Sequence, residues 1–151
     1  MIRRSTNKAL LTSAALVISM LAGTQAGSGA AVPNPILYLT GTEAYTNGAK
    51  QFIRYRYDVL NKNAYPAVMF AAAPNLPPCG TNSKASRTWV DVFDGNGKRL
   101  NRFCALGNPS DLGQIWFALE EGVLPPSVVF IVLTDRRTKA KYKSNLADTT
   151  L

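Results

Sequence analysis

The chain has 151 residues and carries 17 lysines and arginines against 9 aspartates and glutamates, a formal net charge of +8. It contains no histidine, which excludes Ser-His-Asp and Cys-His catalysis and histidine metal sites. Its two cysteines alone do not make a zinc site, and no glycine-rich phosphate loop is present. We therefore expect no catalytic centre of these kinds, no metal and no cofactor.

The first 26 residues are typical of a secretory signal peptide, because basic residues precede an apolar run over residues 9–22 and small residues follow it. Cleavage is expected after Ala26, with later sites up to Ala31 left open. The alternative, a membrane anchor, requires about 20 apolar residues, more than this run offers. Thr24 stands where a lipoprotein would have its lipidated cysteine. The protein is therefore expected to be periplasmic or secreted, without a lipid or transmembrane anchor in the mature chain.

The exported part is long enough for one domain, expected over residues 32–147, with a tail at 148–151. Three of the 17 basic residues lie in the signal, which leaves 14 against 9 acidic residues and a net charge of about +5. This charge favours contact with polyanions, but it is also an ordinary route to solubility.

Two strands are expected in the first part of the domain. The first covers Asn34–Thr42 and ends at Gly41, before a turn at residues 46–48. The second, Lys50–Asn61, alternates between two faces. The face expected to join the core carries Ile53, Tyr55, Tyr57 and Val59. The other face carries Phe52, Arg54, Arg56 and Asp58.

Residues 61–87 form an irregular connection that is broken by prolines. Its apolar part, Ala67–Ala73, is either a short strand or one to two turns of helix, and its large side chains need a covering contact. A connection of this length is either functional or folded down and fixed by Cys79, and we favour the second interpretation. Cys79 and Cys104 are expected to form a disulfide in an oxidising compartment. The alternative, a redox-active pair, lacks the C-x-x-C spacing.

A β-hairpin is the strongest local signal in the chain. Thr88–Phe93 and Arg99–Ala105 flank the sequence Asp-Gly-Asn-Gly at 94–97, whose residues tolerate positive φ. A calcium loop is the alternative, but basic residues replace the acidic ligands that such a loop needs. Trp89 and Phe93 share one face of the first strand. Either the long connection covers these aromatic rings or they form a binding patch, and we favour cover.

Three further strands are expected towards the C-terminus. Gln114–Leu119 is short, whereas Ser127–Asp135 is the most apolar run of the mature chain and is expected to be the central strand. Lys139–Asn145 is expected to pair with it as a hairpin. In that strand Lys139, Lys141 and Lys143 would lie on one face.

Seven short strands without a convincing amphipathic helix indicate an all-β fold, a single antiparallel β-sandwich of about seven strands. Residues 124–132, Leu-Pro-Pro-Ser-Val-Val-Phe-Ile-Val, resemble the fibronectin type III pattern of leucine, proline, aromatic residue and valine, with Phe130 in place of the usual tyrosine. Trp89 on the third strand is similar to the core tryptophan of immunoglobulin-like domains, although Cys79 and Cys104 do not match their cysteine pair. The resemblance implies a fold and no particular activity.

Two basic clusters are the candidate binding residues, and basic side chains near an aromatic ring can bind phosphate or sulfate groups. The first cluster is Arg54 with Arg56. The second, in the final hairpin, consists of Arg136, Arg137, Lys139, Lys141 and Lys143. Lysines on a terminal strand also block edge-to-edge pairing of sheets, and we favour that interpretation.

The sequence thus predicts an exported binding module without catalytic activity. Its expected partner is an unknown protein or an anionic glycan or lipid of the cell envelope, rather than nucleic acid. One alternative is a carboxylate-dependent glycan hydrolase that uses Asp91 with Asp94 or Glu120 with Glu121. The other is a protein inhibitor or an assembly subunit.

Overall fold

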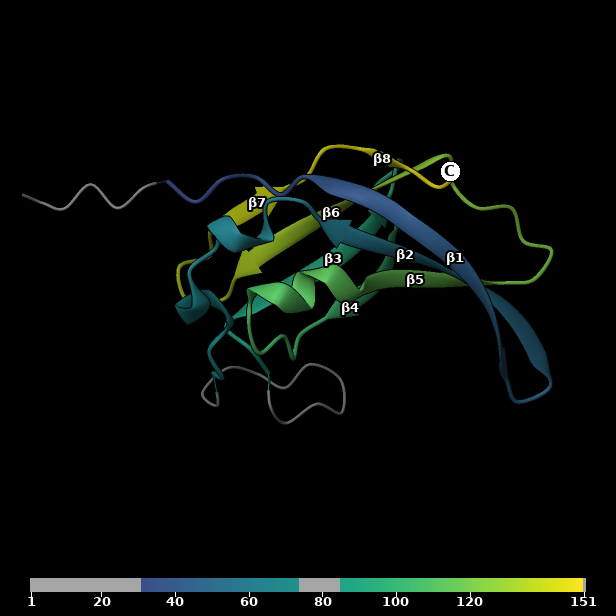
Figure 1. The fold of residues 1–151 in the computed structure, drawn as a ribbon, viewed down its shortest axis with the longest axis horizontal. Helices are drawn as coiled ribbons and strands as arrows, with labels where there is room; N and C mark the ends of the chain where they lie inside the picture. Colours follow the sequence, from purple (N-terminus) through teal and green to yellow (C-terminus); the bar gives the residue numbers. More distant parts are fainter. Residues whose placement is uncertain (1–30, 74–84, 151) are drawn as a thin grey trace, which may run out of the picture. The chain divides into compact units, whose positions relative to one another are not determined.

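A computed structural model describes residues 31–73 and 85–150 (Figure 1). The expected signal peptide, residues 1–26, and Cys79 lie outside the described residues. Within the described ranges the chain forms strands and three short 3-10 helices, which are η1 (Lys62–Ala64), η2 (Ala67–Phe70) and η3 (Pro109–Gln114).

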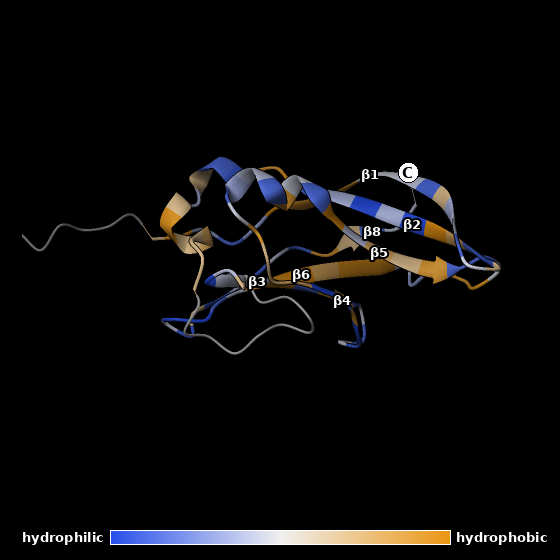
Figure 2. Cartoon of the chain, turned by 90° about the horizontal axis from the view of Figure 1, so that it is seen from below, coloured by the Kyte–Doolittle hydropathy of each residue, from blue (hydrophilic) through white to orange (hydrophobic). Residues whose placement is uncertain are grey.

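The strands form two antiparallel sheets, which Figure 2 shows as separate layers. The three-stranded sheet consists of β1 (Leu37–Asn47), β2 (Lys50–Val59) and β5 (Ile115–Glu120), in the order β1-β2-β5. The five-stranded sheet consists of β3 (Thr88–Asp94), β4 (Arg99–Phe103), β6 (Val128–Asp135), β7 (Lys141–Lys143) and β8 (Ala147–Asp148). Its order is β4-β3-β6-β7, and β8 also pairs with β6. The prediction of an antiparallel β-sandwich is confirmed at this level, with eight described strands in place of about seven.

The hairpin of β1 and β2 confirms the alternation predicted for the second strand and corrects the end predicted for the first. The alternation in β2 is confirmed, because Tyr57 and Val59 are fully buried while Arg56 is exposed. The predicted end of the first strand at Gly41 is wrong, since β1 continues to Asn47. The pairing register shifts between Leu39 and Gly41, so a β-bulge absorbs the glycine without ending the strand.

The core lies between the inner faces of the two sheets. From the three-stranded sheet it receives Tyr57 and Phe117, whose rings stack with centroids 6.1 Å apart. The five-stranded sheet contributes inward-facing aliphatic side chains, all fully buried: Val90, Val92, Val129, Ile131 and Leu133. Ile53, predicted to be a core residue, is half-buried at the margin of this cluster.

The irregular connection after β2 covers one end of the core. Its apolar part forms a single 3-10 turn, η2, which resolves the choice between strand and helix. Met69 and Phe70 are 3% and 1% exposed, and the Thr88 hydroxyl donates a hydrogen bond of 2.6 Å to the Met69 carbonyl. This bond joins the connection to the first residue of β3.

Strand β6 is central, as predicted, because it pairs with β3 on one side and with β7 and β8 on the other. Figure 2 shows it as a mostly hydrophobic strand. The predicted hairpin with the following segment is confirmed, but β7 is only three residues long. Lys139 lies before it in the turn, with φ of 65°. Asp148 in β8 and the buried Thr149 lie beyond the domain end expected from sequence, and both belong to the fold.

Three side chains that carry the resemblance to fibronectin type III and immunoglobulin-like domains lie outside the core between the sheets. Leu124 is 90% exposed in the connection between β5 and β6. Trp89 and Phe130 are buried, but they alternate with the core residues of β3 and β6. They therefore belong to the outer face of the five-stranded sheet.

Two asparagine side chains join the edges of the three-stranded sheet to the other layer. Asn145 accepts a hydrogen bond of 2.8 Å from the Leu37 N–H, and its Nδ2 donates one of 3.0 Å to the Leu37 carbonyl. At the opposite edge, Nδ2 of Asn101 in β4 donates 2.8 Å to the Trp116 carbonyl in β5. Each side-chain amide thus satisfies backbone groups that a strand edge would leave open.

A buried ion pair fixes the chain where β3 begins and β6 ends. Arg87 donates to Asp135 through Nε at 2.8 Å and Nη2 at 2.5 Å, and the two side chains are 17% and 4% exposed. The Arg87 hydrogen bond holds the pKa of Asp135 well below its usual range. The same carboxylate accepts the N–H groups of Arg137 and Thr138, which shapes the following turn.

Replacing Asp135 with asparagine should lower the free energy of unfolding by roughly 3 kcal/mol at neutral pH, because Arg87 would lose its buried partner. The stabilisation is complete above the unfolded-state pKa of about 3.9 and is lost as pH falls below it. The free energy of unfolding, measured with denaturant from about pH 7 to about pH 2, should therefore fall more steeply in the parent than in the variant as the pH is lowered. E120Q is the control, since its exposed pair with Lys50 should change stability by less than about 1 kcal/mol at any pH. Equal acid sensitivity of D135N and the parent would contradict this role.

Candidate functional site

The outer face of the five-stranded sheet carries an ordered set of cations and apolar side chains, which we call the basic face. Cross-strand pairing sets out three rows. The first is Trp89, Thr134 and Lys141, the second is Arg102, Asp91, Val132 and Lys143, and the third is Arg99, Phe93 and Phe130. Cations therefore stand on the two flanking strands, β4 and β7, and apolar residues occupy much of the middle.

The cations also cover the aromatic rings. The Arg136 guanidinium lies 4.2 Å from the centroid of Trp89, and that of Arg102 lies 5.2 Å from the same centroid. At the other end, Nζ of Lys143 lies 4.1 Å from the centroid of Phe130, which stacks on Phe93 at 5.3 Å. Each cation–π contact contributes about 0.5–1 kcal/mol at such a surface.

Asp91 is the single carboxylate in these rows, and it is already neutralised. Arg102 donates to it through Nε at 2.6 Å and Nη2 at 2.9 Å, and Arg99 approaches within 3.8 Å. The hydrogen bond to Asp91 raises the pKa of Arg102 above its ordinary value. Among the residues whose pairing places them on this face, the next acidic one is Asp148, which lies opposite Val128 at the far end of β6. The rows together with Arg136 thus hold five cations against one carboxylate.

The structure brings together two groups of residues that sequence analysis treated separately. Trp89 and Phe93 of the predicted aromatic patch share the basic face with Arg136, Lys141 and Lys143 of the final hairpin. The predicted row of three lysines is shorter than expected, because Lys139 lies in the turn with Arg137. Arg99 and Arg102 were missed, since assigning them to this face requires the register between β3 and β4.

Trp89 does not form an exposed aromatic patch. It is 6% exposed and packs with Ala85 and Cys104, and its Nε1 donates 3.0 Å to the Ser86 carbonyl. The end of the long connection therefore contributes to its cover, together with the two arginines above its ring. Phe93 is half-buried.

The other predicted basic pair lies on the opposite sheet, on the outer face of β2. Arg54 is held between the rings of Tyr45 and Trp116, at 4.5 and 4.6 Å from their centroids, and donates 2.6 Å to Glu43. Arg56 is more open. Its side chain is 55% exposed, and its Nε lies 3.5 Å from the same Glu43 carboxylate. Arg54 is therefore a packed residue, whereas Arg56 is available to a ligand.

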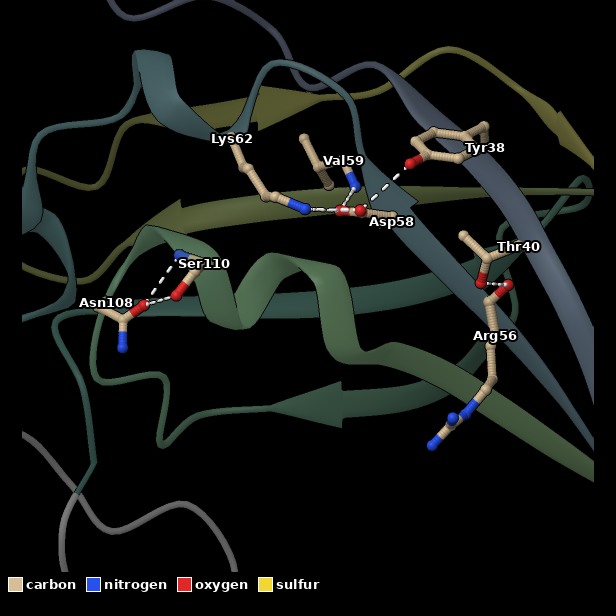
Figure 3. A network of polar contacts seen from close by, with 8 residues as sticks. All are labelled: Tyr38, Thr40, Arg56, Asp58, Val59, Lys62, Asn108 and Ser110. Carbon is tan, nitrogen blue, oxygen red and sulfur yellow. Dashed lines mark hydrogen bonds and ion pairs between the residues drawn. The ribbon is translucent and has the colours of Figure 1, made fainter.

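Arg56 lines a cavity of about 350 Å³, which we call the Arg56 pocket. The other lining residues are Thr40, Gly113, Gln114 and Ile115. Figure 3 shows Arg56 on one side of η3 and the Asp58–Lys62 pair on the other, with Thr40 next to the Arg56 backbone. Sequence analysis missed this site because it did not predict η3.

A capping box explains why η3 forms. The Asn108 side chain accepts the Ser110 N–H at 2.9 Å, and the Asp111 carboxylate accepts the Asn108 N–H at 3.2 Å. Pro109 occupies the first helical turn, where a missing N–H costs nothing. The pattern Asn-Pro-x-Asp was a signal that could have revealed this helix.

Three of the four carboxylates considered for a hydrolase form contacts within the fold. Asp91 binds Arg102, and Oδ1 of Asp94 accepts the N–H groups of Asn96 and Lys98 in its own turn. Glu120 binds Lys50 at 2.9 Å. Across residues 31–73 and 85–150, no three metal-ligating side chains of the His, Cys, Asp and Glu types gather into one group.

Comparison with protein-family models, with curated proteins and with solved structures gives no match for this chain. No helix within the described part of the chain has the length and hydropathy needed to cross a membrane. The site must therefore be interpreted from its own chemistry.

The predicted bridge between Cys79 and Cys104 can be measured directly. Cys104 is 8% exposed beside Trp89, and no free cysteine occurs in the described part of the chain. Thiol titration of unfolded, unreduced protein from an oxidising compartment should find essentially no thiols, and prior reduction should release two. Two thiols without reduction would rule out the bridge.

Proposed function

We propose that this protein is an exported binding module whose basic face contacts an anionic polysaccharide of the cell envelope. The observation that carries the proposal is the charge of that face, five cations against one carboxylate that Arg102 already neutralises. A polyanion is attracted to a surface whose positive charges are not compensated by carboxylates. A general excess of basic residues for solubility would not require these charges to be concentrated on one sheet.

The spacing of the cations suits a polymer with repeated charges. Residues two apart on one strand, such as Lys141 and Lys143, are separated by about 7 Å. Arg99 and Arg102 on β4 lie three strand spacings from β7, which is roughly 14 Å. An extended chain crossing the sheet could therefore contact cations on both flanking strands. Among the described residues of this face, Trp89 and Phe130 are covered and Phe93 is half-buried, so no fully exposed aromatic ring projects to insert into a bilayer.

We also infer that the sandwich is immunoglobulin-like. The orders β1-β2-β5 and β4-β3-β6-β7 correspond to strands A-B-E and C′-C-F-G of such domains. The outward position of Trp89 departs from that pattern. This assignment concerns the fold and supports no particular ligand.

Binding in place of catalysis is supported by the state of the carboxylates. A hydrolase needs one carboxylic acid and one carboxylate that are open to substrate. Asp91 and Asp94 instead accept hydrogen bonds from an arginine and from a turn.

Affinity measurements on immobilised anionic polysaccharides, heparin and polygalacturonate, test the proposal. Binding by the parent should weaken steeply through physiological salt, where exposed charges are screened over about 8 Å. The variant R99Q/K141Q/K143Q should lose most of this affinity, at least about tenfold, while its melting temperature changes little, because the three side chains are exposed.

K50Q is the matched control, since Lys50 is 62% exposed and Arg99 is 51% exposed, on opposite sheets, and Lys50 belongs to neither proposed site. It should bind both polymers like the parent. Equal binding by the triple variant would contradict the proposal, as would binding of the parent to anionic lipid vesicles alone. A triple variant that aggregates, from a parent that binds neither polymer, would assign the lysines to edge protection.

A further inference from the structure

We propose that the Arg56 pocket binds a small hydroxylated carboxylate of the hexuronate type, with the Arg56 guanidinium holding the carboxylate group. The pocket has a volume of about 350 Å³, within the range of ligand sites and suited to a molecule of one sugar ring. It lies on the three-stranded sheet, so this inference does not depend on the basic face.

The Arg56 guanidinium has an open side. Its Nε lies 3.5 Å from Glu43, and its two terminal nitrogens have no partner among the described residues. A guanidinium presents parallel N–H groups that match the two oxygens of a carboxylate. The two terminal nitrogens of Arg56 are therefore hydrogen-bond donors without an acceptor at the margin of the Arg56 pocket.

The charges around Arg56 do not balance. Glu43 is shared by two guanidinium groups, and Arg54 is much the nearer at 2.6 Å. On the other side of η3, Lys62 neutralises Asp58 with contacts of 2.5 and 2.7 Å. Burial alone would raise the pKa of Asp58, but hydrogen bonds from Lys62, Val59 and Tyr38 outweigh it and lower the pKa. One positive charge, that of Arg56, remains uncompensated.

Polar groups line the Arg56 pocket. The Thr40 hydroxyl donates 3.1 Å to the Arg56 carbonyl, which leaves its oxygen able to accept a hydrogen bond from a ligand hydroxyl. The exposed amide of Gln114 offers both a donor and an acceptor. Together with Arg56 these groups suit a molecule that carries hydroxyls as well as one carboxylate.

The site is held in place before any ligand arrives. The capping box fixes the start of η3, and Gly113 lies so close to the Asp58–Lys62 pair that an added Cβ would stand 3.1 Å from Nζ of Lys62 and 3.2 Å from Oδ1 of Asp58. Thr40 and Arg56 lie on paired strands. A preformed site loses little entropy on binding.

Amide NMR titration of the mature protein with glucuronate tests the inference. We expect saturable shifts of the Gly113 and Gln114 signals, with glucose giving none because it lacks the carboxylate. Sulfate should bind at least about tenfold more weakly than glucuronate, because it offers no hydroxyls to Thr40 and Gln114. Absence of shifts with glucuronate, or equal affinity for glucose or sulfate, would overturn the proposal.

Two arginine variants complete the test. R56Q should reduce glucuronate affinity at least about tenfold, since charge-assisted hydrogen bonds are lost. K50Q, at an exposed lysine outside both sites, is the control and should bind like the parent, and R99Q reports on the basic face. The reverse result, loss in R99Q and none in R56Q, would place the monosaccharide on the basic face and refute this site. Polymer binding that fails while glucuronate binding persists would refute only the proposed function.

Discussion

Packing of the inner face of β2 and β5 against that of β3 and β6 is the contact on which the rest of the structure depends. It buries aromatic side chains from one sheet, Tyr57 and Phe117, against aliphatic side chains from the other. Each such side chain contributes about 1.5–3 kcal/mol when fully buried. Because side chains alternate along a strand, this burial also decides which residues must face outward. The positions of Arg54, Arg56, Trp89 and Asp91 follow from it.

The two outer faces that result differ in their electrostatics. On the three-stranded sheet, carboxylates lie among the cations, and Arg54 is fixed between two rings with Glu43 beside it. On the five-stranded sheet, cations from β4 and β7 flank an apolar centre that has a single neutralised carboxylate. The aromatic rings of that centre support the cations, since Arg136 and Lys143 rest on Trp89 and Phe130. The packing of the aromatic rings therefore also positions the cations on this face.

Local pattern was enough to predict three elements, namely β2 from its alternation, the β3–β4 hairpin from the turn sequence at 94–97, and the central position of β6 from its apolar run, because each signal lies within one strand or one turn. It could not place Gly41 in a bulge, since a bulge depends on the partner strand. Nor could it show that Arg102 and Lys143 occupy one row with Asp91, because neighbours across a sheet are set by topology and register. The Arg56 pocket was hidden for the same reason, as it joins β1, β2 and η3. Alternation predicted which residues of one strand share a face, but it could not predict which residues of other strands lie beside them.

The bond between Asn145 and Leu37 has a consequence for the order of folding. The two residues are 108 positions apart in the chain, so their contact closes one of the longest loops in the domain. Contacts of this separation form late, after nearer ones have reduced the entropy of the intervening chain. A chain that is synthesised from its N-terminus must therefore keep the outer edge of β1 open until Asn145 is available. Synthesis of the segment that follows β7, and not only formation of the core, is what closes this edge.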